Sequence, residues 1–86
     1  MKNKVVVYTT KTCPYCMRAK QLLNNKRVPF KEIDITEDQD REQEMIRLTG
    51  KKTVPQILIQ GTPVGGCDDL RELDLSGELD RLLHTK

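Results

Sequence analysis

Apolar residues recur along the chain in short stretches, and their spacing predicts strands and helices in alternation. Brief β-branched or aliphatic runs with polar flanks are typical of buried strands. These runs predict four strands, at residues 4–9, 30–35 and 56–60 and from Val64 onward. Apolar residues that recur every three or four positions are typical of amphipathic helices. They predict helices at residues 14–25 and 36–49 and from Asp68 onward.

Several residues mark where these elements begin and end. Pro14 suits the first turn of a helix, where a missing backbone N–H costs nothing. Thr36 with Gln39 three positions later has the pattern of a capping box. Gly50 fits the position just beyond the end of that second helix. The second helix has few apolar residues, so we expect it to be the least firmly packed.

In the second half of the chain, glycine and proline mark a turn and a helix break. Residues 61–63 read Gly-Thr-Pro and predict a turn between the last two strands. Ser76–Gly77 interrupts the last helical segment. A final helical face follows, formed by Leu79, Leu82 and Leu83.

The order of these elements, β-α-β-α-β-β-α, predicts the fold class. The first two strands and their helix form a βαβ unit, which makes the strands parallel with a right-handed crossover. The last two strands form a hairpin. The sequence therefore predicts one α/β domain over residues 1–86, with a four-stranded mixed sheet flanked by helices on both faces.

Composition narrows the function classes. Fifteen Lys and Arg against thirteen Asp and Glu give a net charge of +2, too balanced for a grip on many nucleic-acid phosphates. No apolar run approaches the ~18 residues of a membrane span, and no stretch resembles a signal peptide. The three cysteines are an odd number, which disfavours a secreted disulfide framework. We expect a cytoplasmic protein that binds neither nucleic acid nor membrane.

Two of the cysteines, Cys13 and Cys16, stand three positions apart. They could be a redox pair, half of a metal site or two core thiols. A zinc site needs two further ligands, and only Cys67 and His84 are candidates. A Cys-x-x-Cys beside a βαβ pattern is typical of a thioredoxin-like fold with a redox site.

The position of Cys13 at the junction of strand and helix favours the redox interpretation. Unpaired N–H groups and the helix dipole stabilise a negative sulfur there, and the thiolate is the nucleophile. Lys11 and Arg18 lie nearby in sequence and add positive potential. Cys16 lies one turn into the helix on the same side, so we expect it to be more buried and protonated. Cys13 would attack a disulfide, and Cys16 would resolve the mixed disulfide.

Two more stretches have a possible role in binding. Thr53-Val54-Pro55-Gln56 holds Val54 extended before a proline that opens a strand; an ordinary strand start would look the same. In Gly65-Gly66-Cys67-Asp68-Asp69, two glycines allow a ligand close to the backbone, and the helix start offers an anion site. Taken alone, this stretch is better explained by a plain turn with an Asp helix cap.

Together TCPYC, TVPQ and GGCDD, in this order, resemble the glutaredoxins, and particularly the short dithiol glutaredoxins of bacteria. The similarity runs from Val5 to Leu83. Thioredoxins are less similar, because their active site usually has a Trp before the first Cys and this chain has none. The monothiol glutaredoxins have Ser at the position of Cys16. The resemblance implies a glutathione-dependent oxidoreductase that reduces protein disulfides and protein–glutathione mixed disulfides, with Cys13 and Cys16 as its catalytic pair.

The resemblance also implies a glutathione groove. Val54–Pro55 would be a cis peptide, and the Val54 main chain would pair with the cysteinyl part of glutathione. The N–H groups of Cys67 and Asp68 would hold the γ-glutamyl carboxylate, and the Asp68 side chain would face the ammonium group. The implied contact residues are Lys11, Tyr15, Thr53, Val54, Pro55, Gly66, Cys67 and Asp68.

One position departs from the family pattern. Glutaredoxins usually have a Lys three residues before the first Cys, where it meets the glycyl carboxylate of glutathione. Thr10 occupies that position here, and the lysine is shifted to Lys11. Either Lys11 or Arg47 could supply the missing charge.

The resemblance extends to partners. It implies glutathione as co-substrate without a metal, a monomer, and disulfide or glutathionylated proteins as substrates, ribonucleotide reductase among them. Two alternatives remain open. One is a thioredoxin-like reductant served by a thioredoxin reductase. The other is a protein that binds a glutathione-ligated 2Fe–2S cluster, which the rigid Pro14 disfavours.

Overall fold

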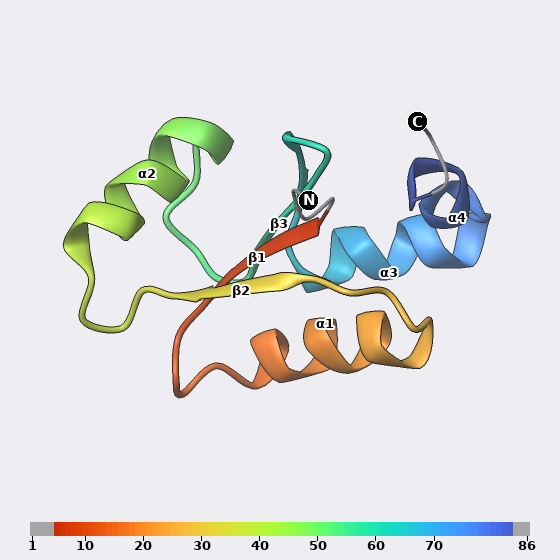
Figure 1. Ribbon diagram of the computed structural model, residues 1–86, viewed down its shortest axis with the longest axis horizontal. Coiled ribbons are helices and arrows are strands. Elements are labelled where there is room, and N and C mark those ends of the chain that lie inside the picture. The colour runs from red at the N-terminus through yellow and green to blue at the C-terminus, as the bar shows by residue number, and fades with distance from the viewer. Residues whose placement is uncertain (1–4, 84–86) are drawn as a thin grey trace.

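The computed structural model describes residues 5–83, built around a four-stranded sheet of order β2-β1-β3-β4 (Figure 1). The strands are β1 (Val5–Thr9), β2 (Lys31–Asp34), β3 (Gln56–Ile59) and β4 (Thr62–Gly65). The helices are α1 (Pro14–Asn25), α2 (Gln39–Thr49), α3 (Cys67–Ser76) and α4 (Glu78–Leu83). None of the helices within residues 5–83 is long and apolar enough to cross a membrane.

The sheet is mixed, as the sequence predicts. Strand β1 pairs in parallel with β2 and antiparallel with β3. Strands β3 and β4 form an antiparallel hairpin. The parallel pair places the loop after β1, which carries Cys13, at one end of the sheet.

Helices cover both faces of the sheet, because side chains along a strand alternate between the faces. Val5 and Val7 pack against α1, α3 and α4 in the larger cluster of buried residues. Tyr8 points to the opposite face and packs against α2. Figure 1 shows α1 and α2 on opposite sides of the strands. The layered α/β architecture is therefore confirmed.

Helix α2 is thinly packed, also as predicted. Met45 is its one buried residue. A polar contact supplements this packing, since the Tyr8 hydroxyl donates a hydrogen bond to Glu44 Oε2 at 2.5 Å. Burial and this hydrogen bond raise the pKa of Tyr8 to about 12.

The predicted start of the second helix is wrong. Asp38 is the N-cap of α2, and its carboxylate accepts a hydrogen bond from the Arg41 N–H at 3.0 Å. Thr36 is engaged elsewhere, because its hydroxyl donates to Asp34 Oδ1 at 2.6 Å and accepts from the Lys11 N–H at 2.9 Å. The left-handed Gly50 ends the helix, as expected.

The turn predicted at residues 61–63 is also displaced. Gln60 and Gly61 both have positive φ angles, as in the tight two-residue turns of hairpins. Pro63 lies inside β4 opposite Leu58, which is possible because β4 is an edge strand. The break at Ser76–Gly77 is confirmed, and it divides the last helical segment into α3 and α4.

Candidate active site at the start of helix α1

Cys13 is the N-cap residue of α1, and the helix begins at Pro14 as predicted. The backbone N–H of Cys16 donates a hydrogen bond to Cys13 Sγ at 3.1 Å. A capping sulfur that accepts from the first helical turn, at the positive end of the helix dipole, is well placed to carry negative charge. Cys13 is partly exposed, so an incoming disulfide can reach it.

Cys16 has the opposite environment. Its side chain is only 1% exposed. Burial, followed by a hydrogen bond with the Cys13 side chain, raises the pKa of Cys16 to about 12. Cys16 is therefore a neutral thiol at physiological pH, and the predicted contrast in burial between the two cysteines is confirmed.

The Val54–Pro55 peptide bond is cis, which confirms the expectation from the resemblance. The loop before β3 lies beside the first cysteine. The Cys13 thiol lies 3.7 Å from the carbonyl oxygen of Val54 and donates to it. Pro55 itself is buried.

A cavity of about 200 Å³ adjoins this loop. Its walls come from the start of α1, the loop before β3 and the start of α3. Seven of the predicted glutathione-contact residues line it: Tyr15, Thr53, Val54, Pro55, Gly66, Cys67 and Asp68. The fold thus gathers three stretches that are widely separated in the sequence.

The turn before α3 shapes one wall of this cavity. Gly65 has a φ of 110°, and a side chain there would collide with the Asp69 carboxylate. That carboxylate accepts a hydrogen bond from the Gly66 N–H at 3.1 Å. A Cβ on Gly66 would lie 3.3 Å from the Pro55 carbonyl oxygen, so the two walls approach closely.

The start of α3 lies at the cavity, where the sequence predicts an anion site. Cys67 and Asp68 occupy its first turn, where backbone N–H groups lack partners within the helix. The Cys67 side chain is partly buried. Burial and the nearby Asp68 carboxylate raise the pKa of the Cys67 thiol, so less of it is present as the nucleophilic thiolate.

The basic residues do not all lie where the sequence suggested. Lys11 is exposed and does not line the cavity. Arg47 does not line the cavity either. The contact of Lys11 with glutathione stays a prediction.

Three further residues line the cavity that the sequence did not predict as glutathione contacts: Lys51, Gln56 and Asp69. Gln56 and Asp69 belong to the TVPQ and GGCDD motifs. Two lysines at residues 51–52 directly precede Thr53, and this pattern could have indicated a cation beside the cavity. Gln56 is 2% exposed, and its amide nitrogen donates to Thr53 Oγ1 at 3.1 Å. Its amide oxygen is buried without a partner.

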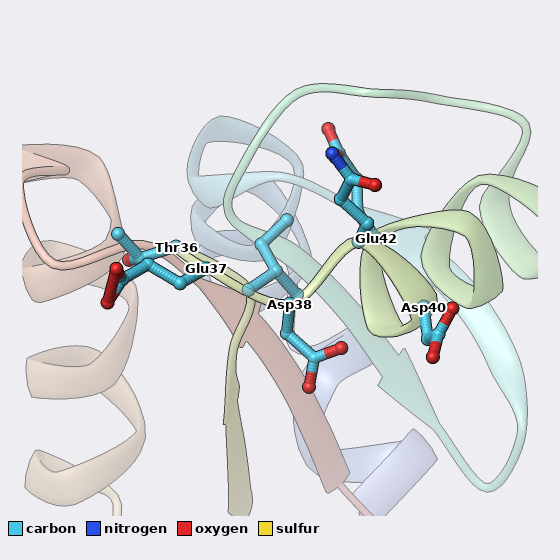
Figure 2. A pocket seen from close by; sticks show the side chains of 7 residues that line it. Thr36, Glu37, Asp38, Asp40 and Glu42 are labelled. Carbon is cyan, nitrogen blue, oxygen red and sulfur yellow. The ribbon is translucent and has the colours of Figure 1, made fainter.

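A more voluminous hollow, of about 560 Å³, lies at the start of α2. Figure 2 shows the carboxylates of Glu37, Asp38 and Asp40 pointing in different directions rather than toward a common point. Within residues 5–83, no group of three or more His, Cys, Asp or Glu side chains could hold a metal ion. His84, a candidate zinc ligand from the sequence, lies outside the described residues.

Comparisons with known proteins agree with this geometry. The glutaredoxin family model matches residues 5–64. The chain is 52% identical over 79 residues to glutaredoxin 3 of Escherichia coli strain K12, covering 92% of this chain and 95% of that protein. It is 54% identical over 79 residues to a glutaredoxin of Pseudomonas aeruginosa, with coverage of 92% and 94%.

Solved structures give the same result. A buckwheat glutaredoxin in complex with glutathione superimposes with a TM-score of 0.86 at 31% identity, covering 94% of this chain and 76% of that one. The solution structure of a glutaredoxin from Brucella melitensis has a TM-score of 0.82 at 47% identity, with coverage of 94% and 88%. The structural similarity therefore extends over most of the chain.

Proposed function

The chain belongs to the glutaredoxin family, and on that premise we propose how its residues divide the work of a glutathione-dependent thiol–disulfide oxidoreductase. Cys13 is the nucleophile and Cys16 the resolving thiol. The observation that carries this assignment is the contrast between them. Cys13 caps the helix and is partly exposed, whereas Cys16 is buried behind it and protonated.

With a glutathionylated protein, Cys13 alone performs the first exchange. The Cys13 thiolate attacks the glutathione sulfur, and the protein substrate leaves as a thiolate that takes up a proton. A second glutathione then attacks the Cys13–glutathione disulfide, releases glutathione disulfide and restores the Cys13 thiolate. An N-cap thiolate serves both steps, because it is a good nucleophile and a good leaving group.

With a protein disulfide, both cysteines take part. Cys13 opens the disulfide and forms a mixed disulfide with the substrate. Cys16 then attacks the Cys13 sulfur, which releases the second substrate thiol and leaves a Cys13–Cys16 disulfide. Two molecules of glutathione reduce that disulfide. Glutaredoxins have reduction potentials of about −200 to −230 mV, which lie within reach of a cytosolic glutathione pool.

Glutathione is the co-substrate, and we propose that it occupies the cavity beside Cys13. The Val54 main chain pairs with its cysteinyl part, as in strand addition. The N–H groups of Cys67 and Asp68 take the γ-glutamyl carboxylate, and the Asp68 side chain attracts the ammonium group. Tyr15 and Thr53 line the groove, and Gly66 allows the close approach. Lys51 lines the same cavity and is a cation for the glycyl carboxylate, alongside Lys11.

The remaining assignments concern the domain, the oligomeric state, the protein substrates and the location in the cell. We propose that residues 1–86 form a single glutaredoxin domain that acts as a monomer. Its protein substrates are disulfide or glutathionylated proteins, with ribonucleotide reductase among the candidates. We place it in the cytoplasm, because its chemistry requires a pool of reduced glutathione.

A coupled assay tests the proposed function. The reduction of a small glutathione mixed disulfide is followed through NADPH consumption with glutathione and glutathione reductase. We expect turnover by the wild type and by Cys16→Ser, and none by Cys13→Ser. Activity only when thioredoxin reductase replaces glutathione and glutathione reductase would contradict the proposal and favour a thioredoxin-like reductant.

A further inference from the structure

A chain of polar contacts ties the helix that carries Cys16 to the sheet. Lys20 Nζ lies 2.8 Å from Glu32 Oε2 on β2. The hydroxyl of Thr9 donates to the same carboxylate oxygen at 2.7 Å. Thr9 lies on the central strand and is 0% exposed. One carboxylate oxygen thus receives a buried hydroxyl and a lysine ammonium together.

This network holds Lys20 against the sheet, one helical turn beyond the resolving thiol on the same helix. Lys20 follows Cys16 by four residues on α1, and such pairs have Cβ atoms about 5–6 Å apart on the same side of a helix. A free lysine on a helix surface would extend into water. The contact with Glu32 instead draws this one toward the sheet, and its side chain is only 29% exposed. Thr9 holds Glu32 in turn.

Cys13 and Lys20 are the ionisable groups that act on Cys16. Glu32 binds Lys20 directly, and Lys20 also acts on Asp34 on the same strand. Strand β1 contributes Thr9 to the network, and the hydroxyl of Thr9 donates its hydrogen bond to Glu32.

The reaction itself changes the environment of Cys16. In the reduced protein, burial, the hydrogen bond with Cys13 and the charge of Cys13 all raise the pKa of Cys16, whereas the Thr10 backbone and Lys20 lower it. Once Cys13 is bonded to a substrate sulfur, it carries no charge and accepts less strongly. The hydrogen bond with Cys13 and the charge of Cys13 then raise the pKa of Cys16 less than before. Lys20 still lowers the pKa of Cys16.

We propose that Lys20 is a positioning residue for the resolving step, held by the Thr9–Glu32 pair so that its ammonium stabilises the Cys16 thiolate when Cys13 is in a mixed disulfide. In that step Cys16 gives its proton to solvent, and its thiolate attacks Cys13 Sγ. The Cys13–substrate disulfide breaks, the Cys13–Cys16 disulfide forms, and the substrate thiolate leaves and is protonated. The two protein thiols are oxidised and the substrate disulfide is reduced. The inference rests on the proposed roles of Cys13 and Cys16.

The resolving step can be isolated with an aromatic disulfide. Substoichiometric 5,5′-dithiobis(2-nitrobenzoate) reacts first with the most reactive thiol, Cys13, and releases one coloured thiolate. The attack of Cys16 then releases a second coloured thiolate in an intramolecular phase. Stopped-flow absorbance resolves the two phases, and their rates are measured as a function of pH.

The informative variants are Lys20→Gln, Lys20→Arg and Lys31→Gln. Lys20→Gln should slow the second phase roughly two- to fivefold at neutral pH and move its pH midpoint upward, because the thiolate loses a neighbouring charge. Lys20→Arg keeps the charge and should restore both. Lys31→Gln makes the same change in net charge on an exposed residue of β2, and it should leave the second phase unchanged.

The outcomes separate this inference from the proposed function. A wild type without a second phase would contradict the roles of Cys13 and Cys16. A normal second phase and pH midpoint in folded Lys20→Gln would overturn the role of Lys20 alone. A lower melting temperature with an unchanged pH midpoint would assign the Lys20–Glu32 pair to stability and likewise overturn it. If Lys20→Gln does not fold, Lys20→Met makes the same comparison.

Discussion

The cavity beside Cys13 and the hollow at the start of α2 are two depressions of one small molecule, and they differ in what their walls can do. The hollow has about 560 Å³ and the cavity about 200 Å³. Acidic side chains that diverge surround the hollow (Figure 2). The cavity combines a helix start, a nearby thiol and side chains of both charges.

The difference teaches that convergence of functional groups, and not volume, marks the site. Asp38 at the hollow is already occupied as a helix cap. At the cavity, Val54 lies in the wall together with Cys67 and Asp68, which form the first turn of α3. Glutathione offers carboxylates, an ammonium group and peptide groups that match these partners.

The largest expected effect comes from removing the nucleophile. Cys13→Ser replaces a thiol with a hydroxyl that is not ionised at neutral pH. We expect activity in the coupled glutathione assay to fall on the order of a thousandfold or more. Melting temperature should show that the variant folds. Turnover within tenfold of the wild type would mean that the cavity serves another thiol.

The next largest effect is expected from a substitution of Gly65, which has a positive φ. In Gly65→Ala, the new Cβ would meet the Asp69 carboxylate at a φ that L residues rarely adopt. We expect a loss of stability on the order of 1–3 kcal/mol and a higher KM for glutathione, because Asp69 must leave the Gly66 N–H.

Gly61→Ala is the matched control for this variant. Gly61 also has a positive φ, of 82°, but a Cβ there meets no atom within 4 Å. We expect Gly61→Ala to lower the melting temperature without changing the KM for glutathione. Equal KM values in the two variants would contradict a link between the turn at Gly65 and the cavity.

A smaller effect should come from the cation of the cavity. Lys51→Gln should raise the KM for glutathione roughly two- to fivefold with little change in kcat, since it removes one exposed charge. Lys11→Gln tests the lysine that the sequence indicated, and Lys31→Gln is a control of equal charge. If Lys51→Gln behaved like the Lys31 control, Lys51 would have no role in binding glutathione.

No effect on activity is expected at the hollow. Glu37→Gln and Asp40→Asn neutralise two of its carboxylates, neither of which takes part in the proposed chemistry. The coupled assay should give the wild-type kcat and KM for both variants. A change in KM comparable with that of Lys51→Gln would show that the hollow contributes to substrate binding.

The sequence predicted the architecture well, because its signals there are local. Pro14 and the spacing of Cys16, Ala19 and Leu23 give the bounds and buried face of α1. The prediction of where α2 starts was wrong for a physical reason. Thr36 and Asp38 are both good caps, and the contacts of Thr36 with Asp34 and the Lys11 backbone decide between them. The contact with Lys11 joins residues that are 25 positions apart in the sequence, so no local pattern predicts it.

In the candidate site too, features with a local sequence signal were predicted and features that depend on tertiary packing were not. The motifs indicated Cys13, Cys16 and most of the cavity walls. Gln56 belongs to the TVPQ motif, but no local pattern shows that Gln56 or Lys51 lines the cavity. That depends on how the loop before β3 packs against the start of α3. The reverse holds for Lys11, whose position in the sequence suggested a contact but whose backbone is bound to Thr36.

The most direct test of the account is to locate the thiol that forms the glutathione adduct. Cys16→Ser is treated with glutathione disulfide, and the adduct is mapped by peptide mass spectrometry. The account predicts one glutathione on Cys13, since Cys13 is the helix-capping nucleophile and Cys67 has a raised pKa. A folded variant that carried the glutathione on Cys67, or carried none, would contradict it.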